Sequence, residues 1–324
     1  MARFAPPGPL GFGGAPLGDM FARIDDATAE ATLQAAWDCG IRYYDTAPHY
    51  GAGLSEHRFG ALLRGKPRDD YVLSTKVGRL LEPSTEPELA HPFLSAMMFR
   101  RKQDYTAAGA RRSVEDSLQR MGVGRIDVVY VHDLATDHLG DGYEEAFRIA
   151  RDGAFRELIR MREEGMIRAW GLGVNLPEPC VRALRESDPD VFLLAGRYSL
   201  IDLAGTKELF PLCAERGAHV VVGGPYNSGL LAGGTTFDYQ EAPPEQVAAR
   251  DRMAAVAAQH GVDLKAAALQ FCAANPVVAS VIPGAKHADR VRQNAALMRA
   301  EIPAAFWAAL KQQGLLPEDV PTPG

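Results

Sequence analysis

The feature that most constrains the fold of this chain is a regular alternation of short apolar runs with segments of helical periodicity. The alternation repeats eight times. Short, continuously apolar runs are typical of parallel strands buried on both faces, and eight strand–helix units in about 300 residues predict a (β/α)8 barrel. An open, doubly wound sheet is the alternative, because alternation alone does not show whether a sheet closes. The predicted strands are 10–15, 41–44, 71–76, 126–132, 169–174, 191–195, 219–222 and 277–282.

Helices are predicted between and after these strands from apolar residues spaced three and four positions apart. Gly40, Gly122 and Gly165 end three of them, and Asp263 precedes another as a cap. No break in composition divides the chain, so we expect a single domain over residues 1–324. The predicted helices are 26–39, 54–63, 106–121, 154–164, 179–186, 208–216, 245–260, 263–274, 287–299 and 303–312.

Composition excludes several classes of protein. Of the 324 residues 47% are apolar, enough for a sizeable core, and a net charge of −6 without basic runs argues against a nucleic-acid partner. The longest apolar stretches, such as 218–224, are too short to cross a bilayer, and the N-terminus lacks the apolar block of a signal peptide. Four scattered cysteines without a CxxC motif indicate free thiols in a reducing compartment. We therefore expect a cytoplasmic protein with no metal and no membrane partner.

Two connections are too long to be simple linkers. Residues 78–105 follow the third predicted strand and residues 223–244 follow the seventh. Loops longer than about 12–15 residues in a compact domain usually carry function. Both leave the carboxyl ends of strands, where parallel α/β folds build their sites. We therefore expect both loops to wall a pocket.

Side chains that handle protons follow neighbouring predicted strands. Asp45 ends the second strand and Tyr50 comes five residues later, while Lys76 ends the third strand and His132 the fourth. Taken singly, each has an ordinary explanation: a turn aspartate, a rim tyrosine, a surface lysine and a hydrogen-bonded histidine. At the top of a barrel the four would converge on one point. The sequence therefore predicts a catalytic group made of these four residues.

The chemistry of this group suits a reaction that places charge on oxygen. A free tyrosine has a pKa of about 10, and we expect the ammonium of Lys76 to lower that of Tyr50. Asp45 would keep the ammonium charged and oriented, and His132 would hold a carbonyl or hydroxyl oxygen against the phenol. This arrangement favours hydride transfer at carbon together with proton transfer at oxygen.

A glycine-rich run at residues 10–15 opens the first predicted strand. It predicts a strand end where the backbone closely approaches a ligand, at Gly13 and Gly14. The run lacks the GxGxxG pattern, and no acidic residue ends a second strand at the expected distance. A Rossmann dinucleotide loop is therefore rejected.

Several ordered motifs run through the chain from Leu10 to about Arg299. They are Gly-Ile-Arg-Tyr-Tyr-Asp-Thr-Ala-Pro-His-Tyr-Gly (40–51), Ser-Glu (55–56), Ser-Thr-Lys-Val-Gly (74–78), Ile-Asp-Val-Val-Tyr-Val-His-Asp (126–133), Gly-Met-Ile-Arg-Ala-Trp-Gly-Leu-Gly-Val-Asn (165–175) and Ile-Pro-Gly-Ala (282–285). With these motifs the chain resembles the aldo-keto reductases. The resemblance implies a single-domain (β/α)8 barrel with long loops at its C-terminal face and NAD(P)-dependent carbonyl reduction or alcohol oxidation. The family's catalytic tetrad matches Asp45, Tyr50, Lys76 and His132 without substitution.

The resemblance also implies where a nicotinamide cofactor binds. Asn175 matches the residue that holds the nicotinamide carboxamide, whereas the family's glutamine and stacking aromatic appear here as Ala195 and Gly223, with Tyr226 nearby. The start of the helix after the eighth strand offers backbone donors to a phosphate. The implied cofactor-binding residues are Gly13, Gly14, Asn175, Gly223, Pro225, Ser228, Leu230, Pro283, Gly284, Ala285, Lys286, Arg290 and Asn294.

The choice between NAD and NADP depends on a few charges. Arg290 and Lys286 could meet a 2′-phosphate, and both could equally be solvated helix residues. The family's strongest NADP sites place a lysine where this chain has Gly284. We therefore expect the chain to use both cofactors, with NAD at least as good for sugar oxidation.

A finer resemblance, in residues 12–18, 194–202 and 223–233, points to the aldose 1-dehydrogenase group. That group includes L-fucose, D-threo-aldose and L-galactose dehydrogenases, and pyridoxal 4-dehydrogenases are similar. It implies oxidation of a cyclic hemiacetal to a lactone, with Tyr50 as the base. The expected partner is a small sugar or aldehyde, and a homo-oligomer is left open. Two other classes stay open: a nucleotide-binding regulatory barrel subunit, against which the intact tetrad argues, and a barrel enzyme without nicotinamide, such as a phosphate-sugar isomerase.

Overall fold

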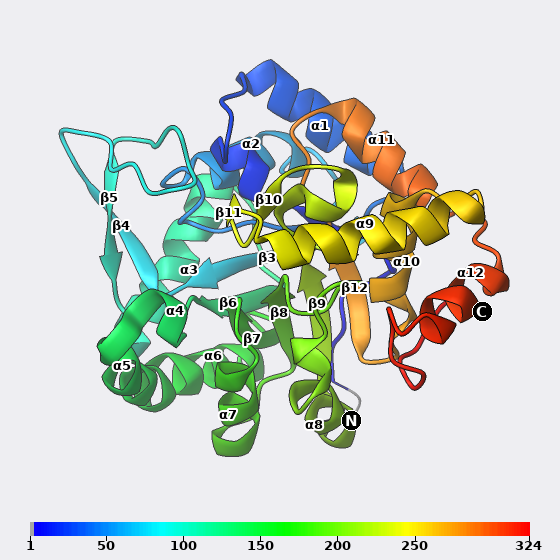
Figure 1. The fold of residues 1–324 in the computed structure, drawn as a ribbon. Coiled ribbons are helices and arrows are strands. Elements are labelled where there is room, and N and C mark those ends of the chain that lie inside the picture. Colours follow the sequence, from blue (N-terminus) through cyan, green and yellow to red (C-terminus); the bar gives the residue numbers. More distant parts are fainter. Residues whose placement is uncertain (1–2) are drawn as a thin grey trace.

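Eight parallel strands form the centre of the computed structural model, which describes residues 3–324. Each strand pairs with its neighbours in chain order, and the helices surround the strands (Figure 1). This confirms the predicted barrel architecture and excludes a doubly wound sheet, whose strand order would reverse. The strands are β1 (Phe12–Gly13), β2 (Tyr43–Asp45), β3 (Val72–Val77), β6 (Val128–His132), β7 (Ala169–Val174), β8 (Val191–Ala195), β9 (His219–Gly223) and β12 (Val278–Ile282).

The first and last strands meet at a seam that brings the sheet round on itself. The backbone N–H of Gly11 donates to the Val281 carbonyl at 2.9 Å, and the Val281 N–H donates to the Pro9 carbonyl at 2.9 Å. A further parallel bridge joins Gly13 to Gly284. The seam therefore depends on backbone groups on both sides of the short β1.

The helices begin and end at the signals that the sequence carries. Asp25 accepts a hydrogen bond from the Thr28 N–H at the start of α1, and Asp263 caps α10 as predicted. Gly122 ends α3 with a φ of 62°, in the left-handed region that favours glycine. The helices are α1 (Asp26–Asp38), α2 (Leu54–Leu63), α3 (Ala107–Met121), α4 (Thr136–Leu139), α5 (Tyr143–Ala150), α6 (Arg156–Glu163), α7 (Glu178–Glu186), α8 (Leu209–Arg216), α9 (Pro244–Gln259), α10 (Leu264–Ala274), α11 (Ala288–Leu297) and α12 (Ala304–Gln312).

The helix predicted at 154–164 is longer than its prediction. It begins as α5 at Tyr143 and continues through a π-helical turn at Arg151–Phe155 into α6. Gly153 lies in this turn, where a β-carbon would come 2.8 Å from the backbone nitrogen of Ala107. The glycine therefore serves close packing against the start of α3 and does not end the helix.

Both long connections contain strands that the sequence analysis did not predict. In the first, β4 (Arg79–Pro83) pairs antiparallel with β5 (Phe99–Gln103). In the second, β10 (Thr236–Phe237) pairs with β11 (Gln240–Glu241). Figure 1 shows β4 and β5 projecting beside the barrel and the β10–β11 turn above the strand ends.

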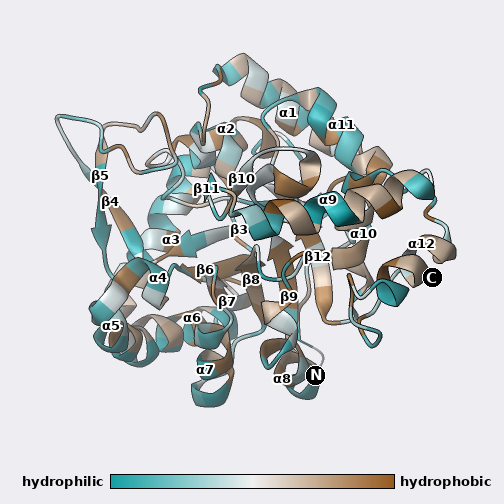
Figure 2. Cartoon of the chain, in the orientation of Figure 1, coloured by the Kyte–Doolittle hydropathy of each residue, from teal (hydrophilic) through white to brown (hydrophobic). Residues whose placement is uncertain are grey.

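The apolar core has two layers. One fills the barrel interior, and the larger one lies between the strands and the helices. Figure 2 shows the strands mostly brown and the outward helix faces more teal, the pattern expected when both sheet faces are covered. The four cysteines are free thiols, as predicted. Within residues 3–324 no helix is both long and apolar enough to cross a membrane.

Candidate active site

The four predicted catalytic side chains converge at the carboxyl ends of adjacent strands. Asp45 ends β2, Lys76 lies near the end of β3 and His132 ends β6, while Tyr50 lies in the turn that follows β2. These strands are neighbours, because β2 pairs with β3 and β3 pairs with β6, all in parallel. Parallel pairing puts their ends on one face of the barrel, and this is what brings the four residues together.

Lys76 and Asp45 form a buried ion pair at the base of the site. The lysine Nζ donates to Asp45 Oδ2 at 2.8 Å and to the Thr46 carbonyl at 2.9 Å. The other carboxylate oxygen accepts a hydrogen bond from Ser74 at 2.7 Å. Burial raises the pKa of Asp45, while the ammonium and the serine hydroxyl oppose that shift. The lysine is therefore oriented by two groups, the Thr46 carbonyl and the Asp45 carboxylate, and the latter has the role that the sequence predicted for it.

Tyr50 lies next to this ion pair and against two rings. The Nζ of Lys76 is 4.8 Å from the centre of the Tyr50 ring. The ring centre is 5.8 Å from that of His132 in an edge-on arrangement, and 5.7 Å from that of Phe93 in a stacked one. The phenol and the imidazole thus face the same space.

The expected direction of the Tyr50 pKa shift is wrong. Burial, and then the carboxylates of Asp45 and Asp133, raise the pKa of Tyr50 well above its ordinary value, with Arg79 as the opposing charge. Lys76 does not lower it enough, because its charge is neutralised by Asp45 at 2.8 Å. The neutral phenol is therefore the resting form, which suits proton donation to a carbonyl oxygen.

His132 is held as a neutral imidazole. Burial, and then the charges of Arg79 and Lys76, lower the pKa of His132 well below its ordinary value. Its backbone carbonyl accepts a hydrogen bond of 2.9 Å from the hydroxyl of Tyr105. A neutral ring keeps one N–H donor for a substrate oxygen.

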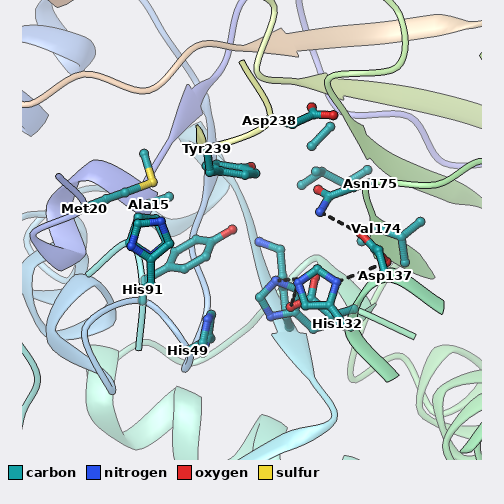
Figure 3. Close-up of a pocket in the computed structure, with 18 of the residues that line it drawn as sticks. Ala15, Met20, His49, His91, His132, Asp137, Val174, Asn175, Asp238 and Tyr239 are labelled. Atoms are coloured by element: carbon teal, nitrogen blue, oxygen red, sulfur yellow. Dashed lines mark hydrogen bonds and ion pairs between the residues drawn. The ribbon is translucent and has the colours of Figure 1, made fainter. Parts of the chain in front are cut away.

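A cavity of about 410 Å³ opens above the tetrad. The two long loops contribute to its wall, as predicted, with His91, Pro92 and Phe93 from the first and Asp238, Tyr239 and Gln240 from the second. Figure 3 shows Met20 and His91 on one side of the cavity and Asp137 and Asn175 on the other. The remaining lining residues are Ala15, His49, Tyr50, Lys76, His132, Asp133, His138, Gly173, Val174, Leu193, Ala195 and Arg197.

The strand ends where a nicotinamide is expected carry small side chains. Ala195 of β8 pairs in register with Gly223 of β9. A β-carbon on Gly223 would lie 3.2 Å from Leu193 Cδ2 and 3.4 Å from Ala195 Cβ, so a large residue would crowd this floor. Asn175, at the end of β7, lines the cavity and donates to Asp137 at 3.2 Å (Figure 3). The small side chain of Ala195 and the amide of Asn175, which both line the cavity, fit a flat, polar ring.

Close packing of the barrel requires glycine at positions 13 and 14. A β-carbon on Gly13 would lie 2.8 Å from the Ile282 carbonyl oxygen, and one on Gly14 would lie 2.6 Å from the Asp45 carbonyl oxygen. Both glycines are buried. Close packing of the barrel therefore explains them, and their contact with a cofactor stays a prediction.

The residues predicted for the adenosine end gather around the start of α11. The Tyr226 hydroxyl donates to Asn294 Oδ1 at 2.9 Å, and the positive charge of Arg290 acts on the same phenol. Arg290 and Gly284 are exposed, whereas Lys286 is half-buried and precedes the helix. The Tyr226 hydroxyl is thus engaged with a residue of α11. Of the remaining predicted residues, Ser228 is half-buried, while Pro225, Leu230, Pro283 and Ala285 are buried.

Several residues of the site were not predicted, among them Asp133, His138 and His49. Asp133 and His138 lie beside His132, with the Nε2 of His138 3.4 Å from the Asp133 carboxylate. His49 packs edge-on against Phe93, with ring centres 5.3 Å apart, and burial lowers its pKa to about 2. Asp133 directly follows His132 in sequence, and His49 directly precedes Tyr50. This adjacency was the signal by which the sequence could have indicated that both belong to the site.

Fold and site together define a barrel oxidoreductase built around a buried Asp–Lys pair, a tyrosine and a histidine. Comparison with known proteins narrows the class. The model of the aldo/keto reductase family matches residues 9–314. The chain belongs to the aldo/keto reductase family.

Individual relatives agree with this. The chain is 41% identical over 318 residues to a D-threo-aldose 1-dehydrogenase of a Pseudomonas species, covering 95% of this chain and 94% of the relative. It is 41% identical over 322 residues to a pyridoxal 4-dehydrogenase of Microbacterium luteolum, with the same two coverages. Among solved structures, the holo form of aldo-keto reductase AKR11C1 from Bacillus halodurans has a TM-score of 0.71 at 27% identity and covers 99% of this chain and 98% of its own.

Proposed function

We propose that this enzyme oxidises the C1 hemiacetal of an aldose to a lactone with a nicotinamide cofactor. The observation that carries the proposal is the convergence of the Tyr50 phenol and the neutral His132 imidazole beside the Lys76–Asp45 pair. The cavity above them supports a polyol substrate, because Asp137, which also lines it, presents a polar group suited to hydroxyls.

In this proposal the chain handles the proton and positions the reacting oxygen. His132 donates its N–H to the C1 oxygen and holds that oxygen against the Tyr50 phenol. Tyr50, in its ionised form, takes the C1 hydroxyl proton, and Lys76, held in place by Asp45, lies beside the Tyr50 ring. The nicotinamide supplies the acceptor for the C1 hydride. In the reverse direction the neutral phenol returns the proton to the carbonyl oxygen.

Binding of the cofactor is assigned to two groups of residues. Asn175 would hold the carboxamide over the small floor formed by Ala195 and Gly223. The exposed backbone before α11, around Gly284 and Lys286, would meet the adenosine phosphate together with the N-terminus of that helix.

We further propose that both NAD and NADP are used. Arg290 is exposed near Tyr226 and Asn294, and a guanidinium there can meet a 2′-phosphate. Gly284 supplies no charge, which leaves NADP without a second fixed cation at that point. A solved relative from Klebsiella pneumoniae, 20% identical, was determined with NADP and acetate. At this identity the relative shows that the fold is shared, and its use of NADP does not carry over to this chain.

A substrate panel with both cofactors tests these proposals. Formation of the reduced cofactor is followed at 340 nm with L-fucose, other aldoses and pyridoxal, and its consumption is followed with simple aldehydes. We expect one or more aldoses to be oxidised and the lactone to be recovered. Reduction of simple aldehydes alone, with no sugar oxidised under either cofactor, would contradict the proposal.

Pyridoxal is a second candidate substrate, favoured by the aromatic side of the cavity. Phe93 stacks on Tyr50, and Tyr239 stacks on Phe21 with ring centres 6.4 Å apart. A pyridine ring in the cavity can pack against Phe93 and Tyr239, which both line it, and the hemiacetal of pyridoxal offers the same chemistry as that of a sugar. In the panel, a higher kcat/KM for pyridoxal than for every aldose would select this alternative.

A further inference from the structure

An ion pair between Arg79 and Asp133 lies directly beside the histidine of the site. Arg79 is the first residue of β4, and its Nη1 is 2.7 Å from Asp133 Oδ2. The exposed fractions of the two side chains are 14% and 10%. The other carboxylate oxygen of Asp133 is 3.6 Å from the Nε2 of His132. The reaction proposed above uses neither Arg79 nor Asp133.

The backbone fixes this carboxylate in place. Asp133 directly follows His132 and has a φ of 50°, in the left-handed region that non-glycine residues seldom adopt. Its N–H donates to the Gly173 carbonyl at 2.9 Å, and Tyr105 holds the His132 carbonyl. A strained conformation that is held by several neighbours is typical of a functional position.

Arg79 enters this arrangement because Gly78 turns the chain. Gly78 has a φ of 105°, and a β-carbon there would lie 2.5 Å from the Tyr105 ring. The turn directs β4 back beside the end of β6, and so places the guanidinium at the aspartate. The first long loop therefore contributes a charge to the catalytic centre as well as a wall to the cavity.

Charges of both signs face His132 from all sides. Burial, Arg79 and Lys76 disfavour its protonation, and the carboxylate of Asp133 would favour it. With the Arg79 guanidinium 2.7 Å away, the negative charge of that carboxylate is offset and favours protonation of His132 less. The titratable and charged groups around His132 are Arg79 of β4, Lys76 of β3, His49 and Tyr50 after β2, His138 of α4 and Asp133 beside it.

We propose that Arg79 is a positioning residue: by holding the Asp133 carboxylate it keeps His132 neutral and aimed at the substrate oxygen. The inference rests on the role proposed for His132. A residue that served only to fasten β4 to the barrel would leave the protonation of His132 unchanged, so the two readings differ in a measurable property.

The test replaces Arg79 and follows His132 directly. In Arg79→Gln the buried carboxylate has no guanidinium, and proton uptake by His132 compensates it. We expect the 15N NMR titration of the His132 ring to move up by about 1–3 pH units, the range for a nearby opposite charge, which the unpaired Asp133 carboxylate supplies. The kcat/KM profile should gain a transition at the same pH. Arg79→Lys keeps the charge and should keep the wild-type titration. His132→Gln identifies the signal.

Two further variants separate the alternatives. In Arg79→Gln with Asp133→Asn no carboxylate remains, so the new transition should disappear. In Arg79→Gln with His138→Gln the transition should persist, since it belongs to His132. Its loss there would place the proton on His138 and overturn the inference.

The outcomes distinguish this inference from the proposed function. An unchanged His132 titration in a folded Arg79→Gln protein would overturn the inference and leave aldose oxidation untouched. A wild type that oxidises no aldose would overturn the proposed function, while the NMR titration would still decide whether Arg79 controls the charge of His132. Thermal unfolding of each variant confirms that it is folded, because removing one member of a buried pair destabilises a protein.

Discussion

The ammonium of Lys76 donates a 2.8 Å hydrogen bond to the carboxylate of Asp45, and the side chains are only 1% and 3% exposed. The pair is neutral as a unit, so the lysine cannot offset the burial of Tyr50, whose ring centre is 4.8 Å away. The pair fixes the geometry of the site, and the pKa of the phenol stays high.

Replacing Lys76 by methionine should slow sugar oxidation and move its pH dependence upward. The variant leaves the buried Asp45 carboxylate without its partner, which raises the pKa of Tyr50 further. The pH profile of kcat/KM measures the shift. Lys76→Met with Asp45→Asn is the matched control, since it removes both charges and should reverse part of the shift. An identical profile for wild type and Lys76→Met would show that the lysine is not coupled to the phenol.

Tyr50→Phe should nearly abolish turnover and leave cofactor binding intact. The phenylalanine keeps the stacking on Phe93 and loses only the oxygen that transfers the proton. General acid–base groups typically contribute about 10²–10⁴-fold to the rate. Steady-state rates and fluorescence titration with NADH measure the two effects. A variant within threefold or so of the wild-type rate would refute the assignment.

The two directions of the reaction should respond differently to pH. Because the pKa of Tyr50 is raised well above its ordinary value, the phenolate needed for oxidation is scarce at neutral pH and grows about tenfold per pH unit. Oxidation should therefore accelerate steadily as the pH rises through about 7 to 9, whereas the phenol needed for reduction stays fully populated. Rates in both directions over this range are the measurement. A plateau in oxidation near pH 7 would mean that the phenol ionises far more easily than its burial indicates.

The strands and most helices could be predicted from apolar periodicity, and the tetrad from polar residues at strand ends. The β4–β5 ladder could not, because Arg79, Glu82 and Arg100 give it no apolar pattern and its register joins segments 20 residues apart. The direction of the Tyr50 pKa shift could not be predicted from the sequence either. It depends on how deeply the ring is buried and on whether Lys76 is already paired, and neither is visible along the chain.

Phe93→Ala should raise the KM for the substrate. Phe93 is 5% exposed, lies in the first long loop and stacks on Tyr50, so its loss widens the cavity beside the reacting oxygen. We expect a rise of about tenfold, the value of one good packing contact. Leu89→Ala is the control, because Leu89 belongs to the same loop and is 59% exposed. Equal KM values for Phe93→Ala and wild type would show that this loop does not contribute to substrate binding.

Arg290→Ala should weaken NADP binding and leave NAD binding nearly unchanged. A 2′-phosphate contact with an exposed guanidinium is worth about tenfold in Kd. Titration of both cofactors into the variant measures it. Arg292→Ala serves as the control, since Arg292 lies on the same helix and pairs with Asp289 at 2.9 Å. Equal losses for NAD and NADP in Arg290→Ala would show that this residue does not read the 2′-phosphate.

The seam between β1 and β12 bears on how the barrel is made in the cell. The bonds from Gly11 and Pro9 to Val281 join residues some 270 positions apart, so synthesis must be nearly complete before they can form. The Lys76–Asp45 pair needs only β2 and β3 and is available much earlier. During translation the catalytic end can therefore assemble on an open sheet whose two edges are unpaired until the last strand emerges. Until then, the two unpaired edges are the parts of the molecule that most need protection from pairing with neighbouring nascent chains.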